Sequence, residues 1–99
     1  MARFDVYRLE GGLVLDCQAD LLQVFDRRFV VPLLLLSPTD VPSPTKRLHP
    51  QFDVQAQPYI MATHMAASVP THLLGRRVAT LSHEQDAIMN ALDMLVSGY

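Results

Sequence analysis

The chain has 99 residues, 49% of them hydrophobic and 18% charged, and its formal net charge at pH 7 is −2. This composition predicts one folded globular domain over residues 1–99 rather than a disordered chain. The acidic balance argues against a nucleic-acid-binding domain, because such domains usually carry a basic surplus on one face.

The N-terminus and the single cysteine indicate the cellular compartment in which the protein is expected. Cys17 has no partner for an intrachain disulfide, which favours a reducing cytosol. The opening MARFDVYRLE lacks the apolar segment of a signal peptide. The longest apolar run, 29–36, is interrupted by Pro32 and is much shorter than the ~20 residues that cross a bilayer. We therefore expect a cytoplasmic protein with no membrane segment.

The first half of the chain has the pattern of β-structure. Apolar and polar residues alternate over 4–9, and the Gly11-Gly12 pair supplies a turn before a second run at 13–17. This pattern predicts an antiparallel hairpin. The run 29–36 is rich in strand formers and predicts a central strand. Within it, Pro32 is expected to mark a bulge or an edge-facing position.

The middle of the chain is less regular. Prolines recur through 37–50, which predicts a long surface connection. Residues 66–70 are expected to lead into a turn. Residues 73–81, with a bend at Gly75, favour neither helix nor strand. The strands expected in this part are 52–54 and 59–63.

The C-terminal segment has the clearest pattern. Ser82 and Gln85 have the spacing of a capping box, and Gly98 stands where helices commonly end. We therefore predict a helix over 82–97 that closes a β-rich domain. Its expected apolar face consists of Ile88, Ala91, Leu92, Leu95 and Val96.

No arrangement of residues in the sequence points to catalysis. Asp16, Asp20 and Asp26 recur near a strand end, where they are either general bases or, by default, solvated turn residues. The histidines lack metal-site spacing, so we expect surface or packing roles for His49, His64, His72 and His83. We expect no enzymatic activity, no metal and no cofactor.

Three segments, in order and in spacing, resemble the CcdB family of toxins. DCQADLL at 16–22 is similar to the family's D-V-Q-S-D-[IL]-[IL], and RRFVVPL at 27–33 is similar to R-R-x-V-I-P-L. The stretch 61–83 resembles the family's M-x-T…A-S-V-P…G…L-S-H, which a terminal helix follows. The resemblance covers essentially the whole chain.

The resemblance implies a mostly β fold with one C-terminal helix, an SH3-like barrel of the CcdB/MazF type with a small extra sheet, assembled as a homodimer. It also implies a toxin of a type II toxin–antitoxin system that binds the gyrase A subunit and traps gyrase on cleaved DNA. A CcdA-like antitoxin neutralises such a toxin and together with it represses their operon. Contact with DNA is then indirect, through the antitoxin or gyrase.

The resemblance places the gyrase contact at the helix end, with help from the loop after Asp20. The residues expected to bind gyrase are Leu21, Leu22, Asp93, Val96, Ser97, Gly98 and Tyr99. The residues expected at the dimer interface are Asp20, Leu21, Ser68, Val69, Pro70, Leu95 and Gly98. For the adjacent leucines, burial in the core is an equal alternative.

The tail departs from the family pattern, in which the best-known member ends in aromatic-Gly-Ile. Ser97 replaces the aromatic residue and Tyr99 replaces the isoleucine. We hypothesise that Tyr99 is the aromatic anchor. The helix dipole, Asp93 and the terminal carboxylate make this end negative, which suits an arginine of a partner. The alternative is that Asp93 is a solvated residue and Tyr99 a frayed end.

Two other functions remain as alternatives. The first is a non-toxic CcdB-like interaction or regulatory module that has lost gyrase poisoning through the change at Ser97. The second, less favoured, is a MazF-like endoribonuclease, for which Arg27, Arg28 and His49 are the available parts.

Overall fold

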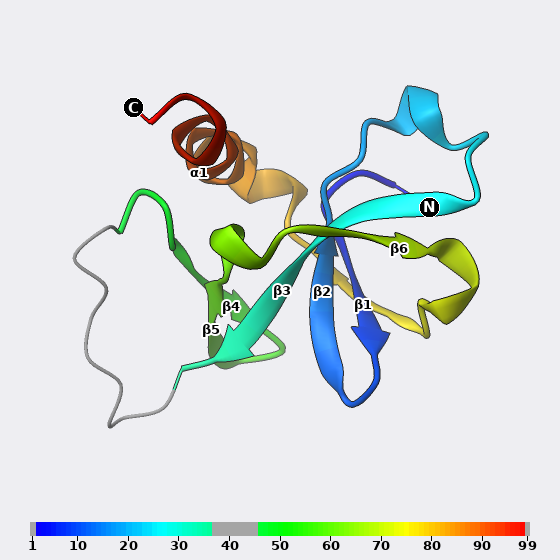
Figure 1. Cartoon of the computed structure of the whole chain (residues 1–99). Coiled ribbons are helices and arrows are strands. Elements are labelled where there is room, and N and C mark those ends of the chain that lie inside the picture. The colour runs from blue at the N-terminus through cyan, green and yellow to red at the C-terminus, as the bar shows by residue number, and fades with distance from the viewer. Residues whose placement is uncertain (1, 37–45, 99) are drawn as a thin grey trace.

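The computed structural model describes residues 2–36 and 46–98, and its fold is mostly β with one C-terminal helix (Figure 1). The strands are β1 (Asp5–Leu9), β2 (Gly12–Asp16), β3 (Arg27–Leu35), β4 (Gln51–Val54), β5 (Gln57–Met61), β6 (Ala67–Pro70) and β7 (Arg77–Thr80). The helix is α1 (Gln85–Ser97), and the short 3-10 turns are η1 (Asp20–Leu22), η2 (Thr63–Met65), η3 (Thr71–Leu73) and η4 (Ser82–Glu84).

The sheet is organised around β3, as its apolar composition predicts. The strand order is β4-β5-β3-β2-β1-β7, and β6 also pairs with β3. One edge of β3 pairs with β2, while the other edge is shared by β6 at 27–30 and β5 at 33–35. The sheet therefore divides at the middle of β3, with β6 and the β4–β5 hairpin leaving in different directions (Figure 1). This arrangement is the expected SH3-like half-barrel, and the β4–β5 hairpin is its additional part.

Pro32 lies at this division and makes no bulge against β2, since Pro32 pairs in register with Val14. Its carbonyl accepts a hydrogen bond from the N–H of Ala62 at 2.9 Å, on the side away from β2. The N–H and C=O of one residue in an antiparallel strand point to the same side. The position of the N–H that proline lacks is therefore on the side of the gap between β6 and β5, where no ladder hydrogen bond is lost. The edge-facing alternative is therefore correct.

The β1–β2 hairpin forms as predicted. Leu9 pairs with Gly12, so the turn consists of Glu10 and Gly11, with φ values of 50° and 85°. Positive φ at both central residues characterises the type I′ turn, whose twist matches that of the two strands. The expected strands at 52–54 and 59–63 correspond to β4 and β5, while much of the expected connection at 37–50 lies outside the described residues.

Two features of the second half differ from the sequence pattern. Residues 66–70 lead into the turn η3, as expected, but residues 67–70 also form a strand, β6, which pairs antiparallel with the start of β3, with Val69 opposite Arg28. The capping box is absent as well. Residues 82–84 form the turn η4, α1 begins only at Gln85, and Glu84 at its N-cap makes no side-chain capping bond. Of the ambiguous 73–81 segment, residues 77–80 form β7 beside β1.

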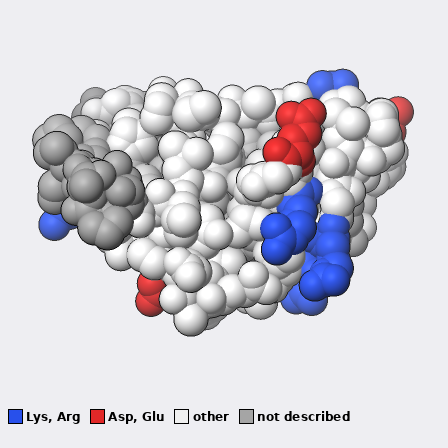
Figure 2. Space-filling model, turned by 90° about the horizontal axis from the view of Figure 1, so that it is seen from below, with Lys and Arg blue, Asp and Glu red and all other residues white. Residues whose placement is uncertain are grey.

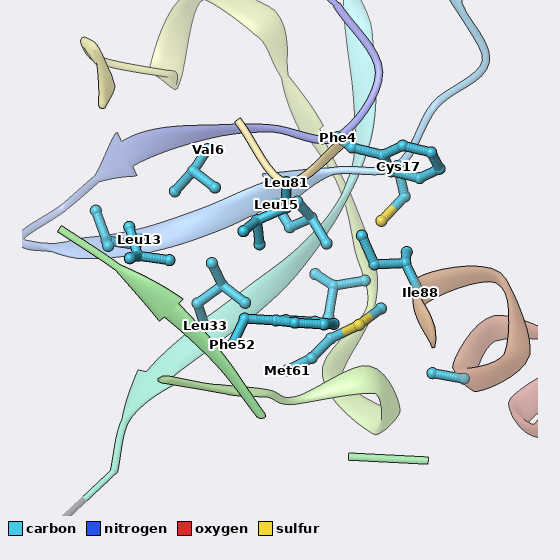
Figure 3. Close-up of a cluster of buried hydrophobic side chains, with 13 residues drawn as sticks. Phe4, Val6, Leu13, Leu15, Cys17, Leu33, Phe52, Met61, Leu81 and Ile88 are labelled. Atoms are coloured by element: carbon cyan, nitrogen blue, oxygen red, sulfur yellow. The ribbon is translucent and has the colours of Figure 1, made fainter. Parts of the chain in front are cut away.

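The core lies between the curled sheet and the first turns of α1. Figure 3 shows side chains from β1, β2, β3, β4 and β5 meeting Ile88 of the helix. Ile88 and Ala91 are buried, whereas Leu95 and Val96 are exposed. The predicted apolar face therefore packs on the core only in its first half.

In the described ranges, no helix is long and apolar enough to cross a membrane.

Candidate partner-binding surface

The last turn of α1 projects beyond the core. Val96 is 85% exposed and Leu95 41% exposed, and Asp93 lies exposed nearby. The helix ends at Gly98, whose φ of 79° is left-handed and whose N–H donates to the carbonyl of Met94 at 2.8 Å. Figure 1 shows this end of the helix pointing away from the sheet. Tyr99, the expected aromatic anchor, lies outside the described residues.

A second exposed apolar segment connects β2 to β3. Leu21 is 88% exposed and Leu22 is also exposed, so the alternative of burial in the core is wrong for them. Val24, at 84% exposure, and Phe25 belong to the same segment, and the sequence analysis did not select them. The signal was present, because the stretch LLQVF is apolar but is too short for a helix and lacks the alternation of a strand. We call Leu21, Leu22, Val24 and Phe25 the apolar loop.

The apolar loop is anchored at both ends. Gln18 donates from Nε2 to the carbonyl of Leu22 at 3.0 Å and accepts at Oε1 from the N–H of Phe29 at 2.9 Å. Asp20 accepts a bond from the backbone N–H of Arg3 at 2.7 Å. Exposed apolar side chains on a braced loop cost less conformational entropy on binding than those on a free loop.

A buried ion pair supports the start of this loop. Both Asp16 and Arg28 are buried, and Nε of Arg28 donates to Oδ2 of Asp16 at 3.1 Å. Oδ1 of Asp16 accepts from the N–H of Gln18 at 3.1 Å, so the pair also fixes the residue that braces the loop. Sequence reasoning placed Asp16 among solvated turn residues or general bases, and the solvated reading was wrong, since the carboxylate is buried and paired with Arg28.

Arg3 connects the loop side of the molecule to the helix. Besides its backbone bond to Asp20, its Nη2 lies 3.2 Å from Sδ of Met89 in α1. Figure 1 shows η1 and the C-terminal end of α1 on the same side of the sheet but apart from each other. The loop leucines and the helix end thus form two separate exposed apolar areas rather than one.

The remaining residues expected at the dimer interface lie on β6. Ser68 is exposed and is held by Arg27, whose Nε donates to Oγ and whose Nη2 donates to the carbonyl, both at 2.9 Å. Val69 and Pro70 are half-buried, and Val69 packs on a small second cluster that includes Tyr7. The dimer contacts themselves stay a prediction.

Cys17 is placed deep in the core. Figure 3 shows it beside Phe4, and its side chain is buried. Burial, followed by the negative charge of Asp16, raises the pKa of the thiol to about 12. Because the thiolate is the reactive form, we expect the native protein at pH 8 to react with a thiol reagent only after unfolding. Labelling kinetics with and without urea measure this, and prompt labelling of the folded protein contradicts the buried position.

Two histidines that are distant in the sequence meet in the fold. Nε2 of His49 lies 2.8 Å from Nδ1 of His64, and the rings are nearly perpendicular. Desolvation, and then the charge of His64, lowers the pKa of His49. In residues 2–36 and 46–98, no group of three or more histidine, cysteine or acidic side chains is placed to hold a metal ion.

The His49–His64 contact predicts a loss of stability in mild acid. A base whose folded-state pKa is lowered contributes stability that is present above its unfolded pKa, about 6.5, and lost as the pH falls below that value. We expect the urea midpoint to fall between pH 7 and pH 5. Replacing both histidines with glutamine is expected to flatten this dependence, and an unchanged slope in that variant contradicts the assignment.

Comparisons with known proteins agree with this architecture. The family model described as "CcdB protein" matches residues 3–98. Among solved structures, one described as "Crystal structure of Mtb toxin" aligns with a TM-score of 0.73 at 16% identity, covering 91% of this chain and 98% of that chain. An "Endoribonuclease in complex with its cognate antitoxin from Mycobacterial species" aligns with a TM-score of 0.76 at 13% identity, covering 97% and 94%.

A third structure, "Mycobacterium tuberculosis toxin MazF-mt6", aligns with a TM-score of 0.71 at 16% identity, covering 93% of each chain. At these identities the similarity shows a shared toxin fold and leaves the target of this chain to be argued from its own surface.

Proposed function

Because this chain belongs to the CcdB protein family, we propose that it is the toxin of a type II toxin–antitoxin pair, which binds the gyrase A subunit and traps gyrase on cleaved DNA. The observation that carries the proposal is the exposed end of α1. Val96 is 85% exposed on a helix whose last turn contains no basic residue to offset the dipole. Such an end is unfavourable in isolation and becomes favourable against an apolar, arginine-bearing partner surface.

In this proposal the toxin acts as a homodimer in the cytoplasm, and its own side chains make or break no covalent bond. The apolar loop, with Leu21 and Val24 almost fully exposed, supports the need for a second protein surface, since monomers rarely expose contiguous apolar groups. Ser68 and its neighbours on β6 complete the proposed dimer contact. A cognate antitoxin neutralises the toxin and represses the operon with it, and the antitoxin complex of a structural neighbour supports such a partner.

The side chains that the nuclease alternative requires each contact another residue of this chain. Arg28 is buried against Asp16, and Arg27 is bound to Ser68. His49 contacts His64 on a different part of the chain. These contacts favour the binding role over the cleavage role, because a catalytic arginine must reach the scissile phosphate.

Expression of the chain without an antitoxin tests the proposal. We expect growth arrest accompanied by cleaved chromosomal DNA, and relief when the cognate antitoxin is co-expressed. Unaffected growth at confirmed expression instead indicates the non-toxic module. Cleavage of RNA by the purified protein without metal indicates the nuclease and overturns the proposal.

A further inference from the structure

Two imidazole rings to which the proposed function assigns no role face each other in the fold. Nε2 of His49 lies 2.8 Å from Nδ1 of His64, and the ring centroids are 4.8 Å apart. The two residues are 15 positions apart in the sequence, so no local spacing indicates that they meet. Imidazole is the side chain that most often binds metals in proteins. The contact therefore brings together two groups with the chemistry of metal ligands.

The backbone on both sides of the pair is held in place. Pro50, which follows His49, accepts at its carbonyl a hydrogen bond from the N–H of Met61 at 2.9 Å. His64 is the middle residue of the turn η2, and Thr63 beside it is buried. Two ligands on a rigid backbone lose little conformational entropy when they close on one ion.

The separation of the two nitrogens fits one coordination geometry. Bonds between imidazole and zinc are about 2.0–2.1 Å long, and those of neighbouring first-row ions are similar. Two such bonds at a right angle place the nitrogens about 2.8–3.0 Å apart, and at the tetrahedral angle about 3.3–3.4 Å apart. The observed 2.8 Å matches the right angle, which is found in square-planar and octahedral sites. A turn of one ring about its Cβ–Cγ bond, a torsion with broad minima, directs both lone pairs at the ion.

The protonation and the exposure of the pair also suit a metal ion. Only a neutral imidazole can donate a lone pair to a metal. Desolvation, and then the charge of His64, lowers the pKa of His49 and so favours its neutral form. His64 is exposed while His49 is half-buried, so an ion can enter from solvent at His64.

The surrounding charges leave the pair accessible to a cation. Lys46 and Arg47 precede His49 but are exposed, and water and salt screen exposed charges. Figure 2 shows a group of basic side chains on the side of β1. His49 precedes β4, and β4 and β1 lie on opposite sides of β3 in the sheet. The main concentration of positive charge therefore lies on a different part of the sheet from the pair.

Two protein ligands make an open site rather than a closed one. In residues 2–36 and 46–98, no third histidine, cysteine or acidic side chain is placed to complete the set. We propose that His49 and His64 bind one divalent transition-metal ion, Ni²⁺ or Cu²⁺, in neighbouring coordination positions, with water in the others. The ion ties the segment before β4 to η2 and stabilises the folded chain by binding it in preference to the unfolded one.

Calorimetric titration of the full chain with nickel chloride tests the proposal, without a polyhistidine tag, which would itself bind the ion. We expect one ion per chain. His49→Gln and His64→Gln, alone or together, are each expected to weaken binding at least about tenfold, because the loss of either ring leaves a single ligand. Ni²⁺ is also expected to raise the melting temperature of the unmodified chain more than that of the double variant.

The matched control is His72→Gln with His83→Gln, which removes the same number of imidazoles at two other exposed positions and is expected to leave the affinity unchanged. The electron paramagnetic resonance spectrum with one equivalent of Cu²⁺ provides a second readout. We expect hyperfine splitting from two nitrogens in the unmodified chain, a result that does not depend on the folding of any variant.

Three results overturn the proposal. The first is the absence of Ni²⁺ binding up to millimolar concentration, or a copper spectrum with fewer than two nitrogens. The second is an equal loss of affinity in the two double variants. The third is that each single variant keeps half of the bound ions, since this indicates two independent rings rather than one chelate.

Discussion

Replacing Arg28 with methionine is expected to lower the free energy of unfolding by about 3–5 kcal/mol, a large part of the total of a small domain. The substitution leaves the carboxylate of Asp16 buried without its counter-charge. It also releases the N–H of Gln18 from a fixed acceptor, which loosens the base of the apolar loop. Urea unfolding followed by circular dichroism measures the effect.

The neighbouring arginine provides the control. Arg27 is exposed and bonds to Ser68 at the surface, so Arg27→Met is expected to cost less than about 1 kcal/mol. The double variant Asp16→Leu, Arg28→Met removes both buried charges and is expected to regain most of the loss. Equal effects of the two single arginine substitutions contradict the role of the buried pair.

Replacing Val96 with glutamate is expected to weaken binding to the gyrase A subunit about 30-fold or more, a loss of about 2 kcal/mol or above, as for central residues of interfaces. Val96 is 85% exposed, so the melting temperature is expected to stay within about 2 °C. Leu73→Glu, at an exposed leucine on η3, is the matched control. Calorimetric titration of both variants distinguishes a specific loss from a general effect of added charge.

The loop and the helix end have separate expected effects. Leu21→Glu is expected to reduce dimer formation as well as gyrase binding, because Leu21 is 88% exposed on the apolar loop. Sedimentation measurements on this variant and on Val96→Glu separate the two roles. A dimer unaffected by Leu21→Glu removes the loop from the dimer interface.

The sequence predicts the elements whose signals are local. The hairpin around Gly11, the apolar strand β3 and the helix ending at Gly98 each follow from a pattern within a dozen residues. The strands β6 and β7 were missed because their pairing with β3 and β1 is set by residues far away in the chain. The predicted capping box does not form, because Ser82 belongs to the 3-10 turn η4, which precedes the helix.

The candidate surface was only partly predictable. The family pattern selects the helix end and the leucines after Asp20, and the structure places Leu21 and Val96 at the surface. Helical periodicity alone placed Val96 on the same apolar face as Ile88, because periodicity does not reveal that packing of the helix on the core ends at Leu92. Likewise, no spacing rule indicates that Arg28 crosses to Asp16, a contact that depends on the pairing of β2 with β3.

We propose that this chain poisons gyrase through its exposed helix end rather than by cleaving a substrate itself. A DNA-cleavage assay with purified gyrase, ATP and supercoiled plasmid tests this role. We expect linear DNA to accumulate with the unmodified protein and with Leu73→Glu, and to be strongly reduced with Val96→Glu. Plasmid that stays fully supercoiled with the correctly folded, unmodified protein, or linear DNA formed equally with Val96→Glu, contradicts it.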